Sequence, residues 1–93
     1  MVRRVRLSLR AQRALDRTPA YIGDKLLAWV ELVERQGLEE TRKVPGYHDE
    51  PLRGPRAGQR SIRLSRAYRA VYTLHRDATG EIAIIEEVSK HGY

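Results

Sequence analysis

The 93-residue sequence contains no cysteine, which excludes a disulfide framework and a thiolate metal site. Its three histidines do not lie four residues apart, as they would on one face of a helix, so they also make a poor zinc site. No segment approaches the roughly 20 apolar residues of a membrane-spanning helix, and the first ten residues lack the apolar core of a secretory signal. These absences predict a cytoplasmic protein that needs no metal or cofactor.

Acidic residues are missing from residues 51–76, which contain seven arginines and no Asp or Glu. The whole chain has a net charge of +6, and 15 of its 18 basic residues are arginine, whose planar donor group suits phosphate. This imbalance favours a polyanionic partner or substrate bound to one basic face. A solvated arginine-rich surface without a specific role is the alternative explanation.

Hydrophobic periodicity predicts a strand and two helices in the first 40 residues of one folded domain spanning residues 1–93. Apolar residues alternate near the N-terminus and then recur at three- and four-residue steps, which is typical of amphipathic helices. We expect a strand over residues 2–9, a helix over 8–17 capped by Ser8, and a helix over 19–36 capped by Thr18 and ended by Gly37.

Residues 43–59 hold three of the four prolines and three of the seven glycines, which indicates a loop. Three strands are expected to follow at residues 59–65, 68–75 and 81–89, joined by short connections that favour antiparallel pairing. The resulting order β-α-α-β-β-β predicts an α+β fold. It would contain a small, twisted, antiparallel-rich sheet of four strands with both N-terminal helices packed on one face.

Two arginines in neighbouring predicted strands fall on the same side of this sheet. Residues two apart in a strand share a face, so Arg63 and Arg69 lie together on the uncovered face if the apolar residues meet the helices. Such a pair repels unless an anion lies between its members, and the sequence therefore predicts a phosphate site. In the alternative, Arg69 forms an ordinary surface ion pair with Glu86 or Glu87.

Four short motifs in this order resemble the RelE/ParE toxin superfamily, on its ribosome-dependent mRNA interferase branch of RelE, YoeB and YafQ relatives. The motifs are EPL at 50–52, RSIRL at 60–64, YRAVY at 68–72 and VSKHGY at 88–93. The resemblance covers essentially the whole chain. It implies a RelE-like type II toxin that cuts messenger RNA on the 70S ribosome without a metal. It also implies a cognate antitoxin. The toxin would reach operator DNA only through this antitoxin.

The resemblance also implies roles for individual residues. Arg69 in YRAVY matches an arginine implicated in phosphate binding and transition-state stabilisation, and Glu50 in EPL matches a carboxylate proposed as general base. His91 and Tyr93 resemble a catalytic His/Tyr pair at the end of YoeB-like chains, although Gly92 separates them here. Catalysis is thus expected from these four residues.

The chemistry of RNA cleavage makes the same demands independently of any relative. The 2′-OH is the nucleophile, so the protein must supply a base, cations around the phosphorane and an acid on the leaving oxygen. A histidine with a pKa of about 6.5 suits the last role, and a tyrosine can stack on an unpaired base. Besides the catalytic candidates, the residues expected to contact substrate or phosphate are Arg60, Arg63, Lys90, His48 and Tyr47.

Two other functions stay open at this point. A toxin of the same fold that targets DNA gyrase without cutting nucleic acid would carry similar strands but would not depend on the acid–base residues. A basic RNA- or DNA-binding module would explain the charge, but the sequence shows neither a helix-turn-helix pattern nor an RNP-like aromatic motif.

Overall fold

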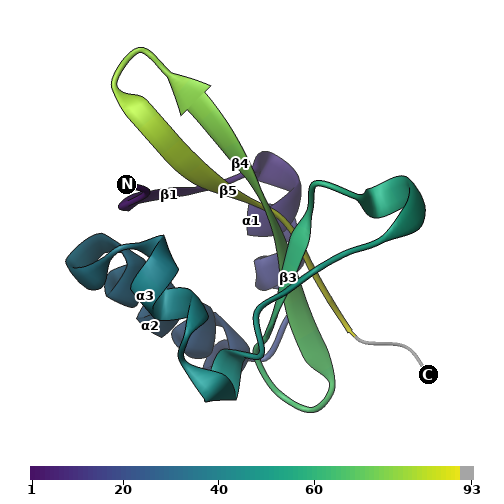
Figure 1. Ribbon diagram of the computed structural model, residues 1–93. Coiled ribbons are helices and arrows are strands. Elements are labelled where there is room, and N and C mark those ends of the chain that lie inside the picture. The colour runs from purple at the N-terminus through teal and green to yellow at the C-terminus, as the bar shows by residue number, and fades with distance from the viewer. Residues whose placement is uncertain (91–93) are drawn as a thin grey trace.

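A computed structural model describes residues 1–90 of the chain (Figure 1). The first half contains a strand and the helices, and the second half contains the remaining strands. Two short 3₁₀ helices, η1 and η2, lie before and after the first of these later strands. The elements are β1 (Arg4–Leu7), α1 (Leu9–Asp16), α2 (Ala20–Gln36), α3 (Leu38–Arg42), η1 (Pro45–Tyr47), β2 (Glu50–Pro51), η2 (Gly54–Arg56), β3 (Arg60–Arg63), β4 (Tyr68–Asp77) and β5 (Gly80–Lys90).

The sheet has five strands in the order β1-β5-β4-β3-β2. β1 runs parallel to β5, and the other neighbours are antiparallel. The predicted α+β class is confirmed, but the predicted count of four strands is wrong because β2 forms inside the segment expected to be a loop. β2 is only two residues long and includes a proline, so it is too short to show the alternation that reveals a strand.

The helix ends were only partly predictable. Ser8 caps α1 as expected, since its hydroxyl accepts the Ala11 amide at 3.0 Å. The expected cap of α2 is wrong, because the Thr18 hydroxyl instead donates to the Ala14 carbonyl at 2.7 Å and α2 begins after Pro19. Gly37 ends α2 with a positive φ of 89°, which glycine adopts without strain. The short helix α3 follows directly and was not predicted.

One hydrophobic core lies between the helices and one face of the sheet. Trp29 of α2 packs on Tyr72 of β4 with ring centroids 5.2 Å apart, and neither side chain is accessible to solvent. The same core takes residues from α1, α2 and strands β3, β4 and β5, namely Ala11, Ile22, Leu26, Val33, Ile62, Ala70, Ala83 and Ile85. The helices therefore cover this face, and the residues that alternate with the core set point to the other face.

The β4–β5 hairpin extends beyond the helices (Figure 1) and is tied to β1 near its tip. Arg4 donates two hydrogen bonds to the Asp77 carboxylate, at 3.1 and 2.7 Å. The amide and hydroxyl of Thr79, in the turn, donate to the same carboxylate. The bonds from Arg4 and then Thr79 hold the pKa of Asp77 well below its ordinary value.

We expect Asp77→Asn to lower the melting temperature by a few degrees at pH 7. Because the pKa of Asp77 is depressed in the folded protein, the stabilisation is present above the ordinary pKa of about 3.9 and is lost as the pH falls. The difference from wild type should therefore shrink steadily below about pH 4. Thermal melts across this range test the prediction. Asp24→Asn, which removes the same charge from the exposed side of α2, should not show this pH dependence.

Candidate functional site

The open face of the sheet brings polar residues of β2, β3 and β4 side by side. In the antiparallel register Glu50 lies opposite Ser61, and Arg63 lies opposite Arg69. Directly opposed residues point to the same face, with their Cβ atoms about 5 Å apart. The predicted placement of Arg63 and Arg69 on one face is therefore confirmed.

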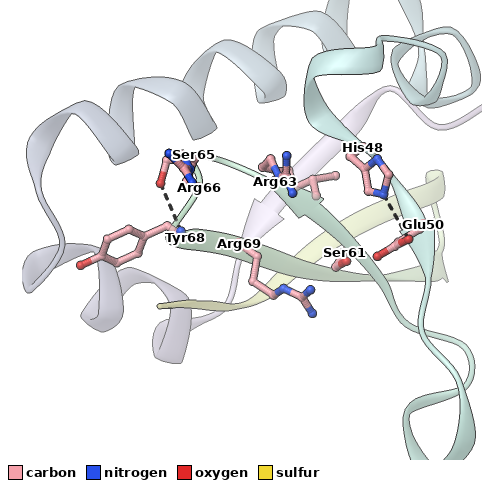
Figure 2. Close-up of a pocket in the computed structure, with 9 residues that line it drawn as sticks. His48, Glu50, Ser61, Arg63, Ser65, Arg66, Tyr68 and Arg69 are labelled. Carbon is pink, nitrogen blue, oxygen red and sulfur yellow. Dashed lines mark hydrogen bonds and ion pairs between the residues drawn. The ribbon is translucent and has the colours of Figure 1, made fainter. Parts of the chain in front are cut away.

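These residues line a pocket of about 230 Å³ where β3 ends and β4 begins (Figure 2). This volume is below that of pockets that enclose drug-sized ligands, and it suits one phosphodiester unit of a longer chain. The lining residues come from the loop before β2, from β2 itself, and from β3, β4 and the connection between them: His48, Glu50, Ser61, Ile62, Arg63, Ser65, Arg66, Tyr68 and Arg69.

His48 and Glu50 form the acid–base side of the pocket. Figure 2 shows the two side chains pointing toward each other, with His48 Nε2 3.4 Å from a carboxylate oxygen of Glu50. Both side chains are about half exposed, so substrate can reach them. His48 has a left-handed backbone, φ 46° and ψ 52°, at the end of η1. Such backbone conformations in non-glycine residues are sparse and cluster at functional sites.

Three arginines form the cationic side. Arg63 is exposed at the end of β3, Arg66 lies in the connection and Arg69 is half-buried on β4. On the neighbouring strand β5, Glu87 forms an ion pair with Arg56, and Glu86 accepts a hydrogen bond from the Thr73 hydroxyl. All three arginines line the pocket together with Glu50, so an anion bound there would meet a surplus of positive charge.

Two residues expected to contact substrate lie elsewhere. Arg60 faces the helix side of the sheet, where it donates to the Asp49 carboxylate at 2.6 Å, because it alternates with Ser61 along β3. Tyr47 is a core residue. Its side chain is almost wholly buried, its hydroxyl donates to the Lys25 carbonyl and the Lys25 ammonium lies over its ring. The structure does not place either residue in the pocket.

The C-terminal candidates are only partly described. Lys90 is exposed at the end of β5 opposite Tyr68, beside the pocket but not among its lining residues. His91 and Tyr93 lie outside the described residues, so their expected roles stay predictions.

Five of the lining residues were not predicted to belong to the site. Ser61 and Ser65 lie two residues before and two residues after Arg63, so the alternation of side chains along a strand could have placed them on this face. Tyr68 is half-buried and packs against the core, and its ring points away from His48 in Figure 2. Arg66 lies in a tight connection, and Ile62 reaches the edge of the pocket from the core side of β3. Neither carries a signal in the sequence.

Residues 1–90 contain neither a candidate metal site nor a candidate membrane-spanning helix. Within this range no group of three or more His, Asp or Glu side chains could hold a metal ion. Over the same range, none of the helices is long and apolar enough to cross a membrane.

Comparisons with known proteins place this geometry in a structural context. No protein-family model and no curated protein matches the sequence. YafQ from E. coli superposes with a TM-score of 0.71 at 18% identity, over 96% of this chain and 93% of that one. The YoeB/ParE toxin from Agrobacterium tumefaciens gives 0.67 at 20% identity, over 96% and 99%.

A third match is the RelBE2 toxin–antitoxin complex from Mycobacterium tuberculosis. It gives a TM-score of 0.58 at 26% identity over 95% of this chain and 96% of that one. The resemblance seen in the four sequence motifs is thereby confirmed by structures that match nearly the whole chain. The protein has the fold of the RelE/ParE toxin superfamily, which it shares with these YafQ, YoeB/ParE and RelBE2 structures.

Proposed function

We propose that the protein is a type II toxin that cuts messenger RNA in the ribosomal A site. The observation that carries the proposal is the pairing of an acid–base side, His48 and Glu50, with a cationic side, Arg63 and Arg69, in one pocket. This is the set of groups that cleavage by the 2′-OH requires. The fold shared with YafQ and YoeB/ParE toxins supports the same class.

The mechanism follows from the positions of the groups. Glu50 accepts the proton of the 2′-OH as that oxygen bonds to the adjacent phosphorus. Arg63 and Arg69 hold the phosphate and stabilise the charge that develops on its oxygens. The bond from phosphorus to the 5′-oxygen breaks, and a histidine protonates that oxygen. The products are a 2′,3′-cyclic phosphate and a 5′-hydroxyl.

The leaving oxygen needs a proton donor, and two histidines are candidates. His91 is the acid that the family resemblance implies, with Tyr93 stacking on a base of the message. His48 is the next candidate because it lines the pocket beside Glu50. Lys90 at the end of β5 adds a further cation near the RNA.

An antitoxin is the expected protein partner. The matched RelBE2 and DinJ–YafQ structures are toxin–antitoxin complexes. A basic open face, here on a chain of net charge +6, is complementary to an acidic or amphipathic segment that would cover it. We expect the toxin to act in the cytoplasm, and to reach operator DNA only through this antitoxin. Expression without an antitoxin should therefore arrest growth, and harmless expression of the intact chain would contradict the proposal.

The activity can be tested with purified components. A 70S ribosome with a defined message codon in its A site should be cut between nucleotides of that codon. The same RNA free in solution should be cut far more slowly. A 2′-deoxy substitution at the nucleotide that carries the nucleophile should abolish cutting. Cleavage that survives this substitution would exclude the mechanism, and no cleavage of either RNA would exclude the nuclease.

Glu50→Gln should lower the single-turnover rate on the ribosomal complex by about 100-fold. This effect is at the lower end of the range for loss of a general base, because His48 lies next to Glu50. The amide keeps the size of the side chain but cannot accept the proton. Since Glu50 is exposed, the melting temperature should not change. Glu31→Gln, on the exposed side of α2, is the matched control and should cut at the wild-type rate. Equal rates for the two variants would remove Glu50 from the mechanism.

A further inference from the structure

Between the exposed His48 and Glu50 lies an aspartate with the opposite environment. No part of the Asp49 side chain is exposed. Both carboxylate oxygens are used: Oδ1 accepts from Arg60 Nε at 2.6 Å, and Oδ2 accepts from the Tyr72 hydroxyl at 2.7 Å. A buried carboxylate is costly unless it is paired and hydrogen-bonded, so these two bonds fix its position.

The partners of Asp49 belong to rigid parts of the fold. Arg60 and Tyr72 lie opposite each other in the β3–β4 register. Tyr72 is wholly buried against Trp29, and its hydroxyl also accepts a bond from Arg42 Nε of α3 at 3.3 Å. Burial, together with the bond to Asp49, raises the pKa of Tyr72 to about 12, so the phenol stays a donor.

The anchoring of Asp49 decides where its neighbours point. Glu50 pairs with Ser61 and faces the pocket, whereas the Asp49 side chain points to the helix side of the sheet, toward Arg60 and Tyr72. Consecutive residues of an extended chain point to opposite sides in this way. His48 precedes them with a left-handed backbone, closed by a bond from its amide to the Pro45 carbonyl at 3.0 Å. Because Arg60 and Tyr72 hold the Asp49 carboxylate on the helix side of the sheet, the side chains of His48 and Glu50 are directed to the open face.

We propose that Asp49 and Tyr72 form a positioning pair that holds the His48–Glu50 loop segment in its reactive orientation. This inference rests on the proposed nuclease function and adds residues that contact no substrate. Errors of about 1 Å in the position of a reacting group can cost about 100-fold in rate. Loss of the Tyr72 hydroxyl should thus affect the chemical step and leave RNA binding unchanged.

The decisive variant is Tyr72→Phe, which keeps the packing on Trp29 and removes one hydroxyl. Asp49→Ala is less informative because it leaves the Arg60 guanidinium without its carboxylate and destabilises the fold. We expect Tyr72→Phe to lower kcat on the ribosomal complex about 10–100-fold, with KM unchanged within about twofold. Thr41→Val is the matched control, because it also removes one buried hydroxyl, outside the pair, and should leave kcat unchanged.

A double-mutant cycle separates positioning from a general loss of structure. If Tyr72 acts through Glu50, Tyr72→Phe should cost little in a chain that already carries Glu50→Gln, because both changes remove the same contribution. Fully additive effects of the two substitutions, or an unchanged kcat in Tyr72→Phe, would overturn the proposal.

A second measurement does not depend on nuclease activity. The His48 amide bonds to the Pro45 carbonyl and the Leu52 amide to the Gln59 carbonyl. In Tyr72→Phe the hydrogen exchange of these two amides should speed up at least about tenfold, while amides of β4 and β5 stay protected. Unchanged exchange at both amides overturns the proposal. If wild type does not cleave ribosomal message, the proposed function fails, and this measurement alone decides whether Asp49 and Tyr72 hold the segment.

Discussion

Arg69→Ala is expected to lower the cleavage of translated message by about 100–1,000-fold, the usual loss when one preorganised donor to a developing oxyanion is removed. Arg69 lies opposite Arg63 on the open face and lines the pocket. Its loss removes a fixed positive charge from the place where the phosphate gains negative charge. Single-turnover rates on the ribosomal complex measure the effect directly.

The fold should tolerate this substitution, because Arg69 points away from the core shared by the sheet and helices. We expect the free energy of unfolding to change by about 1 kcal/mol or less. Arg76→Ala is the matched control: it removes the same charge from the exposed far end of the same strand and should cut normally. Equal losses of rate in both variants would indicate nonspecific electrostatics, and equal losses of rate and stability in Arg69→Ala would indicate a structural role.

Deleting residues 91–93 should also abolish most cleavage, by about 10²–10⁴-fold, if His91 is the general acid. Terminal residues seldom contribute much to stability, so the shortened chain should still fold and melt near the wild-type temperature. His91→Gln should reproduce most of the loss. Tyr93→Phe should cost less than Tyr93→Ala if the ring stacks on a base and does not donate a proton.

The deletion has a clear contrary outcome. A shortened chain that cuts translated message at the wild-type rate would show that the acid lies elsewhere, and His48 would then be the donor. His48→Gln in the full chain separates the two possibilities, because only one histidine should be needed to protonate the leaving oxygen.

The open-face site illustrates what alternation along a strand can and cannot predict. The alternation of side chains along the two strands was enough to place Arg63 and Arg69 on one face, because the apolar residues that alternate with them had to meet the helices. The same alternation puts Arg60 on the helix side, yet its charge suggested a phosphate contact. A half-buried arginine is possible there only because Asp49 provides a carboxylate from a distant loop, and no local pattern reports such a partner.

The loop before β3 was the least predictable part of the chain. Its prolines and glycines correctly indicated irregular backbone, but Tyr47 is buried through contacts with Lys25 of α2, 22 residues away in sequence. Glu50 entered the site through its resemblance to a family motif, and the structure adds the physical reason: β2 pairs with β3 and turns the carboxylate toward the pocket.

The central claim is that this chain cuts message only while it is being translated. Primer extension on a reporter transcript after brief induction of the protein tests it most directly, with a copy of the reporter that lacks a start codon as the control. A ribosome-dependent nuclease predicts cuts in register with the reading frame of the translated reporter and none in the untranslated copy. Growth arrest with both transcripts intact would contradict the claim and would favour a toxin of the same fold that acts on DNA gyrase.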